Sequence, residues 1–346
     1  MNTKTAVTPP TSSNTGLLAR LGKNRRASGT TLAMFAVLIA LPIALPSATL
    51  ATEILIFAMA ALACNLLLGY TGLLSFGQAI FFGAGAYASA LSMIHWNFGL
   101  VGALIVALVV GSVLAMLVGM LCIRRKGIYF VMLTLALTQM AYFLAYTLSD
   151  WTGGDNGLLG VPRPPLALGE MTLMSFASPL AFYGLVSVIF AAIYIIARRI
   201  TDSPFGSTLL AIRENESRAS ALGYDTRLFK IMVFVLSGAI TAVAGALYGM
   251  LLNFVPLSNI ELLMSEQILI MTIIGGTGSL FGSLLGAGSI VLLGDILSSI
   301  WPRWMLLLGV ALIGVVIFMR GGLWGGLHSL LNRESRNSSK PHDEEA

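Results

Sequence analysis

The sequence is organised around one long polar interruption, TDSPFGSTLLAIRENESRASALGYDTRLFK, which occupies residues 201–230. Eight of the chain's 35 charged residues fall within it, and hydrophobic segments crowd both of its sides. Ser203 and Pro204 predict a helix start, because serine is a preferred N-cap and proline is tolerated at the first helical position. Gly223 predicts the stop, since glycine readily takes the left-handed conformation that ends helices. We expect one helix, or two short ones divided near Asn215, lying along the membrane surface and docking on another protein.

The predicted helix has one apolar face and one charged pair. Glu214 and Arg218 are spaced i, i+4 in the order that favours an ion pair on a helix. The apolar face consists of Leu209, Ile212, Ala219 and Leu222. A solvated amphipathic connector would show the same pattern, but this would be the only sizeable cytoplasmic feature between spans.

Composition places the rest of the chain in a membrane. Hydrophobic residues make up 57% of the 346 residues and charged residues only 10%, against about 25% charged in an average soluble domain. Apolar runs long enough to cross a bilayer recur from end to end. We therefore expect an all-α, polytopic integral membrane protein with about ten transmembrane helices: 31–47, 52–69, 76–95, 99–122, 127–148, 180–197, 229–252, 264–280, 283–300 and 303–320.

The distribution of positive charge predicts the orientation. With the N-terminus in the cytoplasm, ten spans put 18 of the 20 Lys and Arg residues on the cytoplasmic side, as the positive-inside rule requires. The net charge of +5 is thus ordinary for a membrane protein and does not indicate nucleic-acid binding. A basic N-terminal stretch before an apolar run also fits a signal peptide, but the polar stretch here is long, which favours an uncleaved first helix.

The predicted domain organisation is a single permease domain between two tails. Residues 1–30 are expected to be a disordered cytoplasmic tail, and 323–346 a cytoplasmic C-terminal tail. The permease domain, 31–322, contains the cytoplasmic segment 201–228 and an extracytoplasmic loop, 149–178. That loop is long for a connector and rich in Gly and Pro, so it is either ordered and partner-facing or a plain link.

Two glycine-rich segments, 69–86 and 275–288, share a pattern: Gly-x-Thr-Gly, then Phe-Gly, then Gly-Ala-Gly. The repetition hints at an internal duplication. Broken backbone at membrane depth is tolerated only where it is buried or lines a cavity, while close helix packing also uses glycine. Neither segment has the Lys-Ser/Thr of a phosphate-binding loop, so we expect no ATP binding by this chain.

Polar residues inside the predicted spans are candidates for a translocation path. Thr134, Thr138 and Gln139 share i, i+4, i+5 spacing, which favours a common polar face. For any one candidate alone, a hydrogen bond between helices is the simpler interpretation. The candidates are Asn65, Gln78, Thr134, Thr138 and Gln139.

Catalysis and metal binding are not indicated. No His/Cys/Asp/Glu cluster has metal-ligand spacing, and no buried pair of carboxylates suggests intramembrane acid–base chemistry. Cys64 and Cys122 both lie in apolar segments, so no disulfide framework is expected. We predict a transport subunit without enzymatic activity, cofactor or metal.

Several motifs resemble one family. They include Gly69-Tyr-Thr-Gly-Leu-Leu-Ser-Phe-Gly-Gln, Thr152-Gly-Gly-Asp-Asn-Gly, Ser203-Pro-Phe-Gly, Ala211-Ile-Arg-Glu-Asn-Glu, Gly275-Gly-Thr-Gly-Ser-Leu-Phe-Gly and Met319-Arg-Gly-Gly-Leu-Trp-Gly, all in the expected order. Across about residues 50–325, the chain resembles the inner-membrane permease subunits of bacterial ABC importers for branched-chain amino acids, of the M type.

The resemblance implies a function, partners and a coupling segment. The implied partners are a homologous second permease, two cytoplasmic ATPase subunits and a periplasmic binding protein, around a multi-pass protein of the inner membrane with both termini cytoplasmic. ABC importers often carry Glu-Ala-Ala, three residues and Gly, whereas Glu216 here precedes Gly223 by seven positions, one more than that spacing. The segment implied to seat on the ATPase comprises Arg213, Glu214, Asn215, Glu216, Arg218, Ala219, Leu222 and Gly223.

Alternatives stay open at this level. The same architecture could import urea, short amides or another small amino acid. A secondary carrier or channel acting alone would transport without an ATPase. A membrane-embedded enzyme is disfavoured by the missing catalytic cluster.

Overall fold

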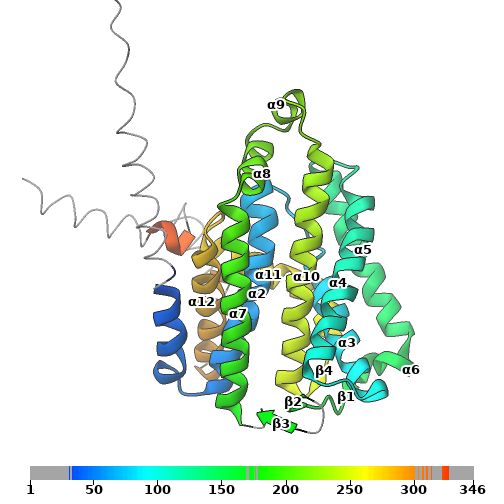
Figure 1. Cartoon of the computed structure of the whole chain (residues 1–346), viewed down its shortest axis with the longest axis vertical. Coiled ribbons are helices and arrows are strands. Elements are labelled where there is room, and N and C mark those ends of the chain that lie inside the picture. The colour runs from blue at the N-terminus through cyan, green and yellow to red at the C-terminus, as the bar shows by residue number, and fades with distance from the viewer. Residues whose placement is uncertain are drawn as a thin grey trace, which may run out of the picture. The chain divides into compact units, whose positions relative to one another are not determined.

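A computed structural model describes residues 31, 33–168, 171–174, 176 and 178–300, together with a few positions between 303 and 326. Contacts divide the chain into Met1–Ala44 and Leu45–Ala346. The first unit contributes one short apolar helix, Ala33–Ala44. Everything below concerns the second unit, in which helices dominate (Figure 1).

The long helices of this unit run in alternating directions. Short elements join them: α6 (Ser149–Thr152), α8 (Pro204–Glu214), α9 (Glu216–Ala221), η1 (Gly154–Asn156) and η2 (Leu257–Ile260). Four strands are shorter still: β1 (Leu158–Leu159), β2 (Leu166–Leu168), β3 (Met171–Met174) and β4 (Phe254–Val255). The long helices are α2 (Ala48–Thr71), α3 (Gln78–Trp96), α4 (Leu100–Cys122), α5 (Ile128–Thr147), α7 (Pro179–Thr201), α10 (Thr226–Leu252), α11 (Leu262–Gly275) and α12 (Leu280–Ile300).

The all-helical, polytopic character is confirmed, but the expected count of ten spans is not. Among the described residues, six helices are long and apolar enough to cross a membrane: α2, α4, α5, α7, α10 and α12. The predicted span 31–47 corresponds to the shorter helix Ala33–Ala44, and 264–280 to the 14-residue α11. The span predicted at 76–95 forms the 19-residue α3, which is not among the six. Most of 303–320 lies outside the described residues.

Helix α2 occupies the centre of the unit. It contacts α7, α10, α11 and α12, and nearly all of its side chains are buried. Close approach elsewhere depends on small residues. A Cβ at Gly245 of α10 would lie 1.9 Å from the carbonyl oxygen of Phe82 in α3, so only glycine allows these two backbones to meet.

The first glycine-rich segment contains a break between two helices. Helix α2 ends at Thr71, and α3 begins only at Gln78. Between them, the backbone N–H of Phe76 donates to Thr134 Oγ1 (3.2 Å), and Thr138 Oγ1 donates to the Phe76 carbonyl (2.8 Å). Both threonines belong to α5, and their side chains replace the hydrogen bonds that the helix break gives up.

The two ends of the bundle differ. At one end, which we call the β end, β1 pairs antiparallel with β4, joining Leu158 to Val255. There Arg163 Nε donates to the Met250 carbonyl (2.7 Å), and its guanidinium lies 5.2 Å from the Phe182 ring centroid. The described part of the loop 149–178 is therefore structured. At the other end, the α8–α9 end, α8 and α9 cover the terminus of α2 and the beginning of α10 (Figure 1).

Candidate coupling site

The polar interruption forms two helices rather than one. Helix α8 begins with Pro204 as its first residue and ends at Glu214. Asn215 then takes an extended conformation (φ −158°, ψ 99°), and its side-chain oxygen accepts a hydrogen bond from the Arg218 N–H at 2.9 Å. Asn215 therefore caps the start of α9, as asparagine commonly does. The predicted division near Asn215 is confirmed.

The predicted helix boundaries hold, with one difference in the capping bond. Gly223 has φ of +90°, the left-handed conformation expected where the segment stops. Ser203 occupies the N-cap position of α8, but its hydroxyl donates to the Ile200 carbonyl (2.6 Å) and accepts no bond from α8. The serine thus ties α8 to the end of α7.

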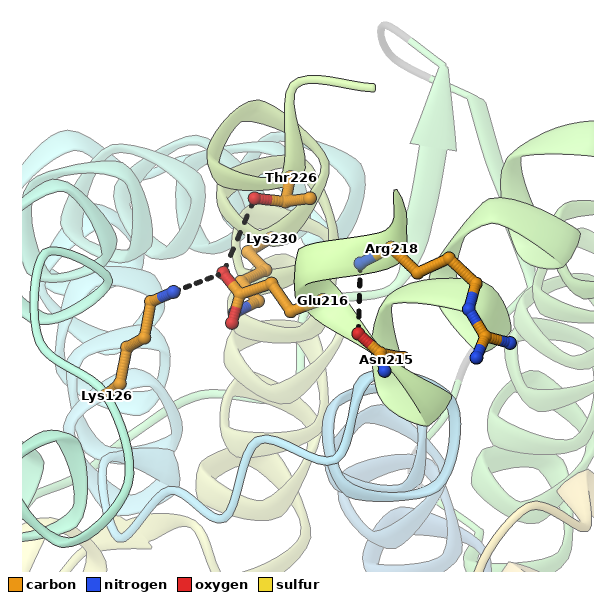
Figure 2. A network of polar contacts seen from close by, with 6 residues as sticks. All are labelled: Lys126, Asn215, Glu216, Arg218, Thr226 and Lys230. Atoms are coloured by element: carbon orange, nitrogen blue, oxygen red, sulfur yellow. Dashed lines mark hydrogen bonds and ion pairs between the residues drawn. The ribbon is translucent and has the colours of Figure 1, made fainter. Parts of the chain in front are cut away.

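The Glu216 carboxylate is the centre of a polar network that joins three parts of the chain (Figure 2). It accepts from Lys230 Nζ of α10 at 2.9 Å and from Lys126 Nζ of the α4–α5 loop at 3.2 Å. Thr226 Oγ1 lies 3.4 Å away and completes the set. Helix α9 is therefore bound both to α10 and to the loop that precedes α5.

The electrostatics of this network favour the ionised carboxylate. Burial by itself raises the pKa of Glu216, but hydrogen bonds and charge attraction from Lys230 and Lys126 outweigh it. The pKa consequently lies below its ordinary value of 4.5. Lys230 is only 7% exposed, so loss of Glu216 would leave a buried ammonium group without its counter-ion.

Arg213 links α8 to the end of α2. Its guanidinium donates a hydrogen bond to the Gly69 carbonyl. The same side chain borders both glycine turns, since a Cβ at Gly72 would lie 3.4 Å from its Cγ and one at Gly278 3.8 Å from its Nη1. The arginine therefore connects the coupling segment to the ends of α2 and α11.

The two Gly-x-Thr-Gly motifs meet at this point. Asn65 Oδ1 accepts from the Gly278 N–H (2.8 Å), and its Nδ2 donates to the Ser279 carbonyl (2.8 Å) and to Ser283 Oγ (3.0 Å). A Cβ at Gly69 would lie 2.5 Å from the Gly278 nitrogen. Two segments more than 200 residues apart in sequence thus form one packed junction beneath Arg213.

The predicted coupling residues divide into inward and outward groups. Arg213 is exposed and Glu216 is partly exposed, but both bond to the chain's own elements, and Ala219 is buried. Glu214, Asn215 and Arg218 are exposed, and so is Gly223. Leu222 is 74% exposed. Of the predicted apolar face, Leu209, Ile212 and Ala219 are buried, but Leu222 does not join them, because α9 ends before it.

The predicted pair of Glu214 and Arg218 does not form. The break at Asn215 places these two residues on different helices, so the i, i+4 geometry is lost. Glu216, two positions further along, makes the ion pairs of this segment instead.

Four of the five translocation candidates are bonded inside the chain. Asn65 joins the glycine turns, and Thr134 and Thr138 hold Phe76. Gln78 Nε2 donates to Ser237 Oγ (3.1 Å), and its Oε1 accepts from Thr241 (2.8 Å). Gln139 alone among the five is exposed. The proposed common face was wrong in this respect, because i+5 places Gln139 well away from the two buried threonines.

Sequence reasoning missed the partners of these groups. The positive-inside rule places Lys126 and Lys230 on the same side of the membrane as Glu216, and this is the signal in the sequence that could have found the network. Ser237 and Ser283 had no such signal, since small polar residues in apolar helices are common. Their roles depend on contacts between distant segments.

Fold and sequence together define a polytopic helical membrane protein. The described residues contain no group of His, Cys, Asp and Glu able to hold a metal ion. Residues 47–319 match the family described as "Branched-chain amino acid transport system / permease component". No solved structure matches the chain.

Curated relatives agree with the family match. The chain is 26% identical over 292 residues to the high-affinity branched-chain amino acid transport system permease protein LivM of Escherichia coli (strain K12), covering 79% of this chain and 69% of that protein. It is 24% identical to a probable branched-chain amino acid transport permease protein LivM of Methanocaldococcus jannaschii, over 67% of this chain and 75% of that one. It is also 27% identical to the autoinducer 2 import system permease protein LsrC of Yersinia pseudotuberculosis (serotype O:3, strain YPIII), over 64% of this chain and 62% of that one.

The chain belongs to the branched-chain amino acid transport permease family. It is a multi-pass permease component of an ABC transporter and is not itself catalytic. Family membership implies that it works within a complex with the transporter's other subunits.

Proposed function

We propose that this chain is a permease subunit of an importer that carries branched-chain amino acids inward across the bacterial inner membrane, driven by separate ATPase subunits. The observation that carries the proposal is the division of the coupling segment. Arg213 and Glu216 anchor it to the bundle, while Glu214, Arg218 and Leu222 project outward. A segment that is bonded to the helix bundle and also presents exposed side chains can transmit force from a docked partner to the bundle.

We place the α8–α9 end, and both termini, in the cytoplasm. The charge count supports this orientation, because Arg124, Arg125 and Lys126 lie at the same end as the coupling segment. The β end would then face a periplasmic binding protein, which the described part of the loop 149–178 would help to receive.

The mechanism follows from the anchors. Movement of α8 and α9 under a closing ATPase would pass through Arg213 to the junction of the α2 and α11 turns. It would pass through Glu216 to α10 and to the α4–α5 loop. These routes reach four of the six candidate spans, so a rigid displacement of the segment would shift several helices together.

The translocation path is proposed to lie between this chain and a second permease. Exposed Gln139 supports this, since an amide facing lipid alone would leave its hydrogen bonds unmade. The solute is proposed to be a branched-chain amino acid because the LivM relatives match more of this chain than the LsrC relatives do. Autoinducer 2 is the second candidate, on the strength of the LsrC matches.

Reconstitution tests the proposal. We consider vesicles that carry the chain with its second permease and ATPase and are supplied with the binding protein. They should take up labelled leucine only when ATP is supplied and the ATPase can hydrolyse it. Competition by unlabelled valine or by autoinducer 2 would separate the two candidate solutes. Uptake by the chain without ATPase would instead establish a secondary carrier and overturn the proposal.

The docking surface and its orientation can be tested separately. Leu222→Glu should abolish co-purification of the ATPase. The control is Leu252→Glu, which changes another exposed leucine at the end of α10 far from the coupling segment and should leave co-purification intact. Ser220→Cys in α9 should react with a membrane-impermeant thiol reagent only in inside-out vesicles; Cys64 and Cys122 are buried and give little background. Labelling of Ser220→Cys in intact cells would place the α8–α9 end outside the cytoplasm and contradict the proposed orientation.

A further inference from the structure

A cavity of about 250 Å³ opens beside the Glu216 network, at the α8–α9 end. Its walls come from the turn after α2, the α4–α5 loop, α8, α9 and the beginning of α10. The charged side chains that line it are Arg125, Lys126, Arg213, Lys230 and Glu216. Four cations and one carboxylate leave a formal charge of 4 − 1 = +3 on the lining.

The single carboxylate cannot neutralise this set. Glu216 pairs with Lys126 and Lys230, which together carry two positive charges. Arg213 bonds to a backbone carbonyl, which has no full charge to offset its own. Arg125 is exposed and joins none of the ion pairs between described residues. Like charges gathered in a recess repel one another, so the cavity favours an anion.

The backbone at the edge of the cavity adds to this preference. The 20-residue helix α5 begins at Ile128, directly after Gly127, and no side chain caps its first N–H groups. A helix start of this kind presents N–H donors and a partial positive charge. Gly127 lines the cavity, so this helix start lies next to the basic lining, which is the main feature of the site.

We propose that this cavity binds a phosphate-bearing anion. Phosphate matches a compact cluster of Arg and Lys better than a carboxylate does, because it offers more acceptor oxygens and charge. The cavity lies where α2 and α4 end and α5 and α10 begin, the level at which lipid headgroups sit, and basic pockets at such positions recognise anionic headgroups. The phosphate therefore comes from an anionic phospholipid or from a soluble anion. A bound phosphate would brace Lys126, and so the contact between the α4–α5 loop and the coupling segment.

The experiment uses the full-length chain in a neutral detergent and follows retained lipid by native mass spectrometry. Phosphatidylglycerol and phosphatidylcholine serve as the lipid probes, and inorganic phosphate at millimolar concentration is the soluble probe. The informative pair of variants is Arg125→Gln and Arg124→Gln. Both remove one exposed arginine from the same loop, but only Arg125 lines the cavity.

We expect the wild-type chain and Arg124→Gln to retain phosphatidylglycerol in preference to phosphatidylcholine. Arg125→Gln should bind it about fivefold more weakly, the effect of one basic residue near a headgroup, and Arg125→Lys should restore binding. Displacement of the lipid by inorganic phosphate would identify a soluble anion as the source; lack of displacement would identify the lipid. Equal retention of both lipids by all variants, or equal weakening in the Arg124 and Arg125 variants, would overturn the proposal. Unchanged melting temperatures would show that the variants are folded.

Discussion

Helices α2 and α5 are similar in apolar composition and opposite in environment. Both are long and apolar, and each carries one amide side chain: Asn65 in the second half of α2 and Gln139 near the middle of α5. In the most apolar 18-residue window, 89% of α2 is buried but only 22% of α5. Asn65 makes three hydrogen bonds inside the chain, whereas Gln139 is exposed.

The difference separates groups that hold this chain together from groups that face outward. Helix α2 is packed on all sides, so its polar residue must be satisfied internally. Helix α5 uses Thr134 and Thr138 on its inner face and leaves Gln139 among exposed apolar residues such as Met132 and Leu135. The same contrast recurs in the coupling segment, where Glu216 is bonded inward and Glu214 is exposed.

The largest expected effect is the loss of stability in Asn65→Leu. The change removes three hydrogen bonds and leaves the Gly278 N–H, the Ser279 carbonyl and Ser283 without their partner. Each buried group left unsatisfied costs about 1–3 kcal/mol, so the total should exceed about 3 kcal/mol. Thermal or SDS-induced unfolding in detergent measures it. Gln139→Leu is the matched control and should change stability by less than about 0.5 kcal/mol; equal effects at the two sites would erase the contrast.

Glu216→Gln should come next in size. Removing the charge leaves Lys230 buried without its counter-ion, and we expect a loss of about 1–3 kcal/mol. If the network transmits force, the variant should also hydrolyse more ATP for each molecule imported. Glu214→Gln removes the same charge two residues away, and it should alter neither stability nor this ratio. An unchanged ratio in Glu216→Gln would limit the network to a structural role.

The same network predicts a pH dependence. Because the pKa of Glu216 is depressed in the folded protein, its contribution is fully present above the ordinary value of 4.5. It is lost as pH falls through the lower, folded-state pKa. The stability difference between wild type and Glu216→Gln should therefore stay constant from pH 7 to about pH 5 and shrink below that range. Unfolding curves of both proteins across these conditions test the prediction, and a difference that already declines near neutral pH would contradict it.

The smallest effect on stability is expected at Gln139, where function should respond instead. Gln139→Leu removes the exposed amide of α5 without breaking any hydrogen bond described in the chain. If this face meets a second permease or the solute path, uptake by the full complex should fall severalfold while the isolated chain remains as stable as wild type. Gln139→Asn, which keeps the amide, should retain more activity. Full uptake by Gln139→Leu would assign this face of α5 to lipid.

Much of the fold could be predicted because its signals are local. Apolar runs marked α2, α4, α5, α7, α10 and α12, and the caps at Asn215 and Gly223 marked the two coupling helices. The span count failed at 31–47 and 264–280, where the helices Ala33–Ala44 and α11 are shorter than a membrane span, and at 76–95, where α3 is not among the six candidates. At 72–77, side chains of α5 satisfy the backbone between α2 and α3, and no periodicity in the segment itself reveals that.

The site was predicted as a segment but not as an arrangement. The family resemblance implied that Arg213 and Glu216 seat on a partner, and that contact stays a prediction. The structure adds bonds to the chain's own elements, from Arg213 to Gly69 and from Glu216 to two lysines. Spacing along one helix cannot decide between inward and outward bonding, because the answer depends on which cation from another helix comes within reach.

By itself, the sequence determined a helical membrane protein with one polar segment, a family, and the set of groups that can form hydrogen bonds or carry charge. These properties follow from composition and short-range pattern. Only the tertiary structure decided that Asn65 joins two glycine turns more than 200 residues apart, that Glu216 binds α10 and the α4–α5 loop, and that Gln139 is left facing outward. The physical reason is that a polar group in an apolar bundle must find its partner in space, and helix packing brings together residues that the sequence keeps apart.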